Sequence, residues 1–284
     1  MQSSITPNRV PMQVARFFRQ FLITAVACSA LSAQQVTIRV DQRSRPISEA
    51  LMQLQKLTDV PIHYEDLQDY SAADLQAPLP AATAVVPKGG SFSVNVPTDP
   101  TGKLPDDLSV ATALNAVIAA AQSAGAVPGT FRVDSSHGGV FFVEPASHHS
   151  STGAAVPTQP VLDTPVNVSL QEVPGIKALD AILQQVSQKT GAGLDDGMGT
   201  FFSGPKVSIT ATNEPAKYVL ARLLADVAPS GTLSYAMLCG PNQRYYAFNI
   251  RNPSVFQPPP RSQPYSPPPL VPSGNRLGAS KKNN

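Results

Sequence analysis

The stretch from Lys206 to Ile250 constrains the fold most strongly, because it carries the patterns of a strand, a helix and a hairpin in succession. Apolar and polar residues alternate at its start, which is the period of a strand with one buried face. Its middle carries apolar side chains three and four residues apart, which predicts an amphipathic helix. Two further alternating runs around a Gly-Pro-Asn turn predict a hairpin. The apolar positions are Val207, Ile209, Ala211, then Leu220, Leu223, Leu224, Val227, then Leu233, Tyr235, Met237, Tyr246, Phe248 and Ile250.

The start of the predicted helix has its own signals. Asn213 is expected to accept hydrogen bonds from the free amides of the first turn, and Glu214 to complement the helix dipole. Pro215 is tolerated there because its missing N–H would have no partner in the first turn.

The same order of patterns recurs along the chain, which predicts an internal repeat. Strand patterns at 36–40 and 92–96 each precede a helical pattern and a further strand or hairpin, and so does VNVSL at 166–170. The sequence therefore predicts an α+β fold of two tandem βαβ-βαββ modules, each with two helices packed between small sheets. The first module would span 34–145 and the second 161–252.

The first repeat resembles the short N-terminal domain of secretins and TonB-dependent signalling receptors, the STN-like domain. In that family a strand, a proline-plus-aliphatic turn, a helix and an "I.Y" strand follow in this order, and the later half of the family pattern is similar to the second repeat. The resemblance implies two tandem divergent copies that contact other envelope proteins and have no catalytic residues. Long inserts at 66–91 and 97–107 depart from the compact family unit. The matching positions are Pro46, Ile47, Glu49, Ala50, Leu51, Leu54, Ile62 and Tyr64.

The first 33 residues have the layout of a signal peptide. Three arginines without an acidic residue precede a short apolar run and a polar stretch, and cleavage is expected after Ala30 or Ala33. Two alternatives are a retained membrane anchor and a lipid attached to Cys28. Without either, the protein is expected to be periplasmic or secreted.

Two other segments have biased compositions. Residues 146–160 are rich in Ser, Pro, Ala and Gly without an apolar period, which predicts a linker between the modules. Residues 253–284 contain nine of the chain's 29 prolines, which predicts a disordered tail with polyproline II segments. This tail would act as a spacer or as an arm that docks a partner.

Composition and motifs argue for binding rather than catalysis. The chain is 42% hydrophobic and only 14% charged, and its formal net charge of +2 does not suggest nucleic acid as a partner. No nucleophile, general base or metal set occurs at a spacing typical of an enzyme. We therefore predict no enzyme activity, no cofactor and no metal site.

The histidines offer no site at a defined spacing. His148 and His149 are adjacent and lack nearby cysteines or carboxylates, so they do not match a structural zinc site. His63 lies in a predicted short strand and His137 in a predicted hairpin turn. Each is interpreted as a solvated histidine or one at the edge of the core.

Three further residues draw attention for their chemistry. Asp195 and Asp196 stand in a glycine-rich stretch that lacks the alternating oxygen ligands of a calcium loop, so a loop joining two halves of the second module is predicted. Cys239 would be the one cysteine left after removal of the leader. We expect it to be a buried, inert thiol, with an intermolecular disulfide as the alternative.

The sequence thus predicts an exported protein that binds other envelope proteins, as an accessory of a secretin, pilus or TonB-type system. A protein that binds a small ligand or glycan in a cleft between the modules is the alternative, and an unrecognised hydrolase is a third possibility. Partner recognition is expected by strand addition at the edge of 166–170, unless that strand is already paired on both sides. The oligomeric state is left open. The candidate partner-binding residues are Val166, Asn167, Val168, Ser169 and Leu170.

Overall fold

The computed structural model describes residues 34–77, 85–195, 205–228, 232–241 and 243–252. They form one compact unit of mixed helices and strands, which confirms the α+β class. The predicted signal peptide, with Cys28, and all but Asn252 of the chain after β13 lie outside these residues, as does Asp196.

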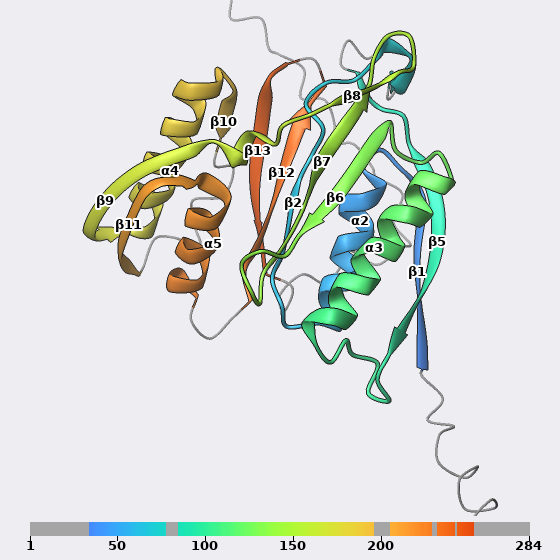
Figure 1. Cartoon of the computed structure of the whole chain (residues 1–284), viewed down its shortest axis with the longest axis horizontal. Coiled ribbons are helices and arrows are strands. Elements are labelled where there is room, and N and C mark those ends of the chain that lie inside the picture. The colour runs from blue at the N-terminus through green and yellow to red at the C-terminus, as the bar shows by residue number, and fades with distance from the viewer. Residues whose placement is uncertain (1–33, 78–84, 196–204, 229–231, 242, 253–284) are drawn as a thin grey trace, which may run out of the picture. The chain divides into compact units, whose positions relative to one another are not determined.

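The chain contains two repeats with the same order of elements (Figure 1). The first consists of β1 (Gln34–Arg43), α2 (Pro46–Leu54), β2 (Ile62–Glu65), β5 (Gly90–Thr98), α3 (Asp107–Ser123), β6 (Gly129–Asp134) and β7 (Phe141–His149). The second consists of β9 (Pro165–Pro174), α4 (Gly175–Thr190), β10 (Gly193–Asp195), β11 (Lys206–Pro215), α5 (Ala216–Val227), β12 (Ser234–Gly240) and β13 (Tyr245–Arg251). Short elements fill the connections, namely η2 (Gln55–Leu57), η3 (Ala72–Asp74), β3 (Leu75–Gln76), β4 (Val86–Pro87), β8 (Ala155–Pro157) and η4 (Val161–Asp163).

Strand pairing is the same in both repeats. The opening strand of each half pairs antiparallel with its counterpart, β1 with β5 and β9 with β11. The last strand pairs in parallel with the strand after the first helix, β7 with β2 and β13 with β10. It also pairs antiparallel with the preceding hairpin strand. Each repeat therefore places its two helices between a two-stranded and a three-stranded sheet, as predicted.

The two inner sheets are fused, which the sequence patterns did not predict. Strand β12 of the second repeat pairs in parallel with β2 of the first, at Ala236 opposite Tyr64 and Met237 opposite Glu65. With β8 on β7, this makes one seven-stranded sheet in the order β10-β13-β12-β2-β7-β6. We call the β2–β12 junction, with the side chains that pack on it, the seam.

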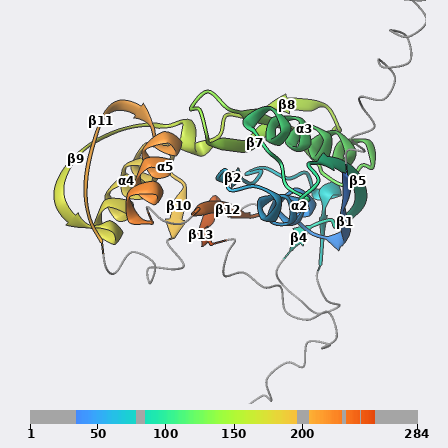
Figure 2. The ribbon, with the colours of Figure 1, turned by 90° about the horizontal axis from the view of Figure 1, so that it is seen from below.

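The helices of the two repeats cover opposite faces of this sheet. Alternate side chains of β7 therefore lie on opposite faces of the sheet. Phe142 packs into the core of the second repeat, while Phe141 and Val143 pack into the core of the first. Figures 1 and 2 show the resulting layers in order: β9–β11, then α4 and α5, the central sheet, α2 and α3, and β1–β5. Each repeat thus has its own hydrophobic core, and the sheet is shared.

Two sequence predictions need correction in this region. Residues 146–160 join the repeats, as predicted for a linker, but part of the segment has regular structure, because β7 continues to His149 and β8 pairs back onto it. Asn213 does not cap α5, because β11 runs on to Pro215, which occupies the N-cap position. Asn213 instead adopts a left-handed backbone conformation, and its N–H donates to Oδ1 of Asn167 across a bulge in the sheet.

Among the described residues, no helix is long and apolar enough to cross a membrane.

Candidate functional site

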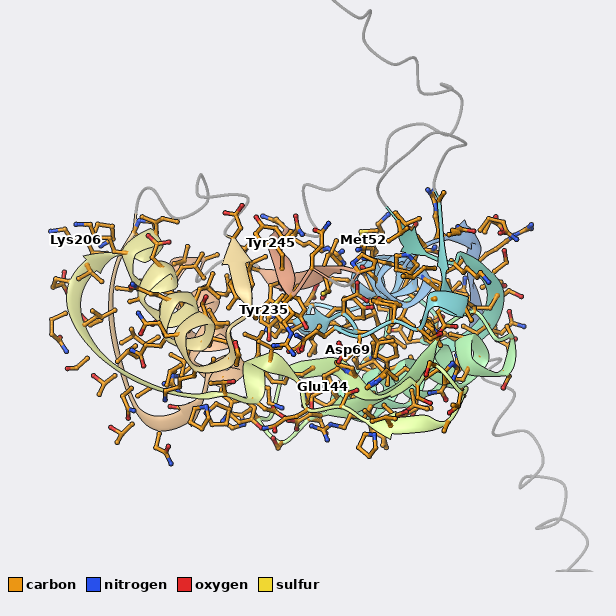
Figure 3. The ribbon with its side chains drawn as sticks, turned by 90° about the horizontal axis from the view of Figure 1, so that it is seen from above. Met52, Asp69, Glu144, Lys206, Tyr235 and Tyr245 are labelled. Atoms are coloured by element: carbon orange, nitrogen blue, oxygen red, sulfur yellow. The ribbon has the colours of Figure 1, made fainter. Side chains whose placement is uncertain are left out.

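Most of the buried charged and histidine side chains of the described chain lie at the seam, around β2. All four residues of β2 are buried, because β12 and β7 flank the strand and helices cover both of its faces. Glu65 therefore faces α5 while Asp66, the next residue, faces α2. Figure 3 shows Glu144 and Tyr235 in this central region, between the helices of the two repeats.

On the α5 face, Lys217 is the centre of a buried ion-pair network. Its side chain is 5% exposed, and Nζ lies 2.8 Å from Asp134, 2.9 Å from Glu144 and 2.6 Å from Asp163. Arg132 contacts Glu144 and Asp163 from the outside, at 2.6 and 3.1 Å. Burial by itself would lower the pKa of Lys217, but hydrogen bonds to the three carboxylates outweigh it and hold the pKa above its ordinary value. The lysine is therefore a permanent cation that ties α5 to the hairpin of the first repeat.

Glu65 joins the same face to the segment between the repeats. Its two carboxyl oxygens accept the backbone N–H groups of Val161 and Leu162 at 2.5 and 3.1 Å, at the start of η4. Burial raises the pKa of Glu65 to about 8, against the opposite effect of these two donors. The Glu65 side chain on β2 thus holds the connection to the second repeat by accepting two backbone N–H groups.

Because burial raises its pKa, the titration of Glu65 is expected to make the free energy of unfolding depend on pH. Because the folded-state pKa lies above the ordinary value of 4.5, the stability contributed by the bound proton is complete below pH 4.5 and is lost as the pH rises towards about 8. While only the folded state holds the proton, the loss is about 1.4 kcal/mol per pH unit.

We expect Glu65→Gln to abolish this slope, measured as the free energy of unfolding in urea at pH values from 6.5 to 8, where the lowered pKa of His63 adds little slope of the opposite sign. Glu172→Gln, at an exposed carboxylate on β9, serves as the matched control and should keep the wild-type slope. Equal slopes in wild type and Glu65→Gln would contradict the assignment.

On the α2 face, Asp66 is the centre of a second buried cluster. Arg45 donates to its Oδ2 at 2.7 Å, and the hydroxyls of Tyr64 and Tyr70 donate to Oδ1 at 2.9 and 3.1 Å. The backbone N–H of Cys239, on β12, also reaches Oδ2 at 3.4 Å, while Arg45 donates to the carbonyl of Cys239 at 2.6 Å. This cluster connects the first repeat to β12 from the opposite face of the sheet.

Two histidines also lie at the contact between the repeats. His63 is 1% exposed, stacks on Tyr235 with ring centroids 4.3 Å apart, and accepts the backbone N–H of Tyr235 at Nδ1. Burial lowers the pKa of His63 to about 3, so the ring is neutral. His137 stacks on Tyr218 of α5 at 3.5 Å. His63 lies deeper in the core than the sequence predicted, whereas His137 is exposed, as predicted for a solvated histidine.

The seam has the chemistry of a structural joint. The cavity bounded by His63, Glu65, Phe142, Glu144, Lys217 and Tyr235 leaves no room for a water molecule. Its charged groups are paired with each other or with backbone groups, as buried charges must be. Lys217 and Glu65 are themselves 4% exposed.

The second candidate surface is formed by the outer edges of the two-stranded sheets. Three of the four strands there are blocked by a side chain from the helix below. Gln53 of α2 bonds both the N–H and the carbonyl of Arg39 on β1, at 3.3 and 2.8 Å. Gln185 of α4 does the same to Asn167 on β9, at 2.9 and 2.6 Å. Each glutamine thus occupies the positions where another strand would bond.

The third blocked edge belongs to β11. Arg222 of α5 donates to the carbonyl of Thr210 at 3.2 Å and pairs with Glu214. A charged group on an edge strand is a common device against pairing with other chains.

Strand β5 is the fourth edge, and it is open along the described chain. Arg39 faces Ser93 in the antiparallel register, and its backbone groups bond Gln53 and so point away from β5. Ser93 is therefore in a non-hydrogen-bonded pair, and its own N–H and carbonyl point outward, as do those of Asn95 two residues later. In the part of the chain that the structure describes, no side chain bonds to these outward groups.

The repeat explains why β5 lacks a cap. Six buried positions of α5 align with six of α3 at a constant offset of 106, and Arg222 then corresponds to Ala116. Ser208 and Ser91, whose hydroxyls accept from the bulged residues Glu172 and Gln42, align Thr210 with Ser93. An alanine side chain is too short to reach a strand edge. The aligned pairs are Val110 and Ala216, Ala113 and Val219, Leu114 and Leu220, Val117 and Leu223, Ile118 and Leu224, and Ala121 and Val227.

The predicted binding strand, Val166–Leu170, corresponds to the central part of β9. It does lie at a sheet edge, since β11 is its one strand partner among the described residues. However, the edge is not open at Asn167, because Gln185 blocks it, and Lys189 donates to the neighbouring carbonyl of Pro165 at 2.6 Å. Val166 and Val168 are buried in the core, while Asn167 and Ser169 are exposed as predicted.

The other residues singled out from the sequence lie apart from each other. Asp195 ends β10 and accepts from the hydroxyl of Tyr245. Cys239 is fully buried, and burial raises its pKa to about 12, which makes it an inert thiol. His148 bonds Thr158, and His149 lies 3.9 Å from Asp74. Across the described ranges, no group of three His, Cys, Asp or Glu side chains is placed to hold a metal ion.

Sequence reasoning missed Lys217, Glu65 and Asp66. Lys217 did carry a signal, because it lies three and seven residues before Leu220 and Leu224 and so falls on the apolar face of α5. Glu65 and Asp66 directly follow a strand pattern, a position that by itself does not distinguish a buried carboxylate from a turn.

Comparison with known proteins adds no relative. No family model, curated protein or solved structure matches the chain.

Proposed function

We propose that this protein is a non-enzymatic interaction module of the bacterial cell envelope, exported to the periplasm, that binds another protein chain by main-chain pairing at the edge of β5. The proposal joins the resemblance to secretin and TonB-receptor short domains with the signal-peptide layout of the first 33 residues. An accessory role in a secretin, pilus or TonB-type system would follow from that resemblance.

The observation that carries the proposal is the difference between β5 and the other outer strands. Gln53, Gln185 and Arg222 block β1, β9 and β11, while the outward groups of Ser93 and Asn95 are open in the described chain. An open edge offers paired donors and acceptors to an extended segment, so affinity can come from main-chain hydrogen bonds. Retaining one open edge beside three blocked ones is what a binding strand requires.

Two other observations support binding over catalysis. The charged groups at the seam are engaged in joining the repeats, and no space remains there for a ligand. The alternative of a small molecule held between the repeats therefore gains no support. Beside the β5 edge, a shallow hollow of about 380 Å³ is lined by Thr37, Arg39, Asp41, Ser91 and Ser93, and would contact side chains of an added strand.

Site-specific photo-crosslinking in the native host tests the proposal. A photoreactive amino acid at Ser93 is expected to crosslink to a protein chain in the envelope, because an added strand would lie within reach. The same group at Thr210, the equivalent position on the blocked edge of β11, is the matched control and should give no such product. Equal labelling from both positions, or none from Ser93, would contradict binding at β5.

A further inference from the structure

We infer that the strand that occupies the β5 edge is β5 of a second copy of this chain, so that the protein forms a two-fold symmetric dimer through β5 and α3. This inference rests on the proposed function, because it names the partner at the same edge. It commits to an antiparallel pairing of two β5 strands.

The outer edge of β5 is complementary to the same edge of a second copy. In an antiparallel pair centred on Val94, Ser93 of one copy faces Asn95 of the other, and this happens twice. Each uncapped N–H then meets an uncapped carbonyl, which satisfies all the outward groups of both residues. Pro97, which has no N–H, falls at the ends of the paired region, where proline is tolerated.

The side chains of β5 are also compatible with pairing to β5 of a second copy. On the helix side, half-buried Val94 would meet its own counterpart, and Phe92 would meet Val96 of the partner strand. The nine residues of β5 include no charge, so an identical edge encounters no like-charge repulsion. The outer strands β9 and β11 instead carry charged residues, namely Glu172, Lys206 and Glu214.

The helix beside the edge provides an independent observation. The one charged residue of α3 is Asp107 at its first position, and the helix is uncharged from Leu108 to Ser123, whereas α4 and α5 of the second repeat each carry three charged residues. Leu108 is 76% exposed at the start of α3, the largest exposure among the large hydrophobic side chains of the described chain. An outer helix face without charged residues is typical of a face that another part of a protein covers. The symmetric pairing of β5 would bring the two α3 helices side by side.

Sedimentation velocity on the purified chain tests the dimer. The wild type is expected to dimerise, and Ala116→Arg to weaken the dimer at least about tenfold, because the new guanidinium would cap Ser93 as Arg222 caps Thr210 and would bury a charge in the interface. Ala225→Arg, at an exposed position of α5, is the matched control and should leave the dissociation constant unchanged. A monomeric wild type, or a dimer that Ala116→Arg does not weaken, would overturn the inference.

Disulfide trapping tests the register separately. Two Val94 residues would form a non-hydrogen-bonded pair, whose Cα separation of about 4.5 Å falls within the range of a disulfide. In a Cys28→Ala background, Val94→Cys should form a covalent dimer under mild oxidation, while the background chain with buried Cys239 should not. Ser208→Cys, on the blocked strand β11, is the control for random collision. Equal trapping by both variants would reject this register.

The outcomes separate the inference from the proposed function. A monomeric wild type whose Ser93 crosslinks a different envelope protein in cells would overturn the dimer and leave the proposed function in place. A monomer without any Ser93 product would remove both. A Ser93 product at the mass of two copies, together with a Val94→Cys dimer, would support both.

Discussion

Replacing Lys217 by methionine is expected to lower the free energy of unfolding by about 3–5 kcal/mol, the usual cost of leaving buried charges without their partner. Methionine retains the apolar part of the side chain and removes the ammonium group that holds Asp134, Glu144 and Asp163 together. Urea unfolding at neutral pH measures the change. Lys177→Met, at an exposed position of α4, is the control and should change stability by less than about 0.5 kcal/mol.

A double-mutant cycle then identifies the cause of the loss. If buried Glu144 is the group left uncompensated, Lys217→Met combined with Glu144→Gln should cost less than the sum of the two single changes. Additive losses would show that Lys217 and Glu144 do not stabilise each other. A loss below about 1 kcal/mol for Lys217→Met alone would show that the network contributes little to the joint between the repeats.

Leu224→Ala is the second large effect that we expect, a loss of about 2–5 kcal/mol, as for other buried leucines truncated on the core face of a helix. Leu224 is 2% exposed and packs in the core of the second repeat, so truncation is expected to leave a cavity that the neighbouring side chains fill only in part. Thermal or urea unfolding measures the loss.

The matched control is Leu108→Ala, because Leu108 is 76% exposed. Measured in dilute solution, so that self-association does not contribute, it should change stability by less than about 0.5 kcal/mol. A loss well under 1 kcal/mol for Leu224→Ala would mean that the core of the second repeat is loosely packed.

The helices and most strands could be predicted from the sequence because their patterns are local. The apolar stripe from Leu220 to Val227 predicted α5, and the alternation in Val207, Ile209 and Ala211 predicted β11. The predicted start of α5 was wrong because asparagine is favoured both at a helix N-cap and in the left-handed conformation of a bulge. Strand β11 extends past Asn213 to Pro215, so Asn213 occupies the bulge.

The fusion of the two inner sheets could not be predicted, because it depends on contacts between distant residues. His63 and Tyr235 are 172 positions apart, and β2 is too short for its burial on both faces to show as a pattern. The strands within the predicted linker at 146–160 were missed for the same reason. Pairing with β7 orders β8, whose composition alone is that of a loop.

The choice of binding edge also depended on tertiary contacts. VNVSL looked open since it lacks proline and charge, but Gln185, far along the next helix, blocks it. The open edge at Ser93 is visible only when the two repeats are aligned, because the decisive feature is the short side chain of Ala116 where the other repeat has Arg222.

The pairing of β2 with β12 has a consequence for synthesis, because the first repeat emerges from the ribosome before β12 has been synthesised. The N–H of Cys239, which donates to Asp66, is synthesised 173 positions later than Asp66. Until then one edge of β2 lacks the strand that pairs with it. Unpaired edges on incomplete chains are where intermolecular association begins. Truncated or stalled chains that end before Ser234 are therefore expected to aggregate, because they lack β12, the strand that pairs with this edge of β2.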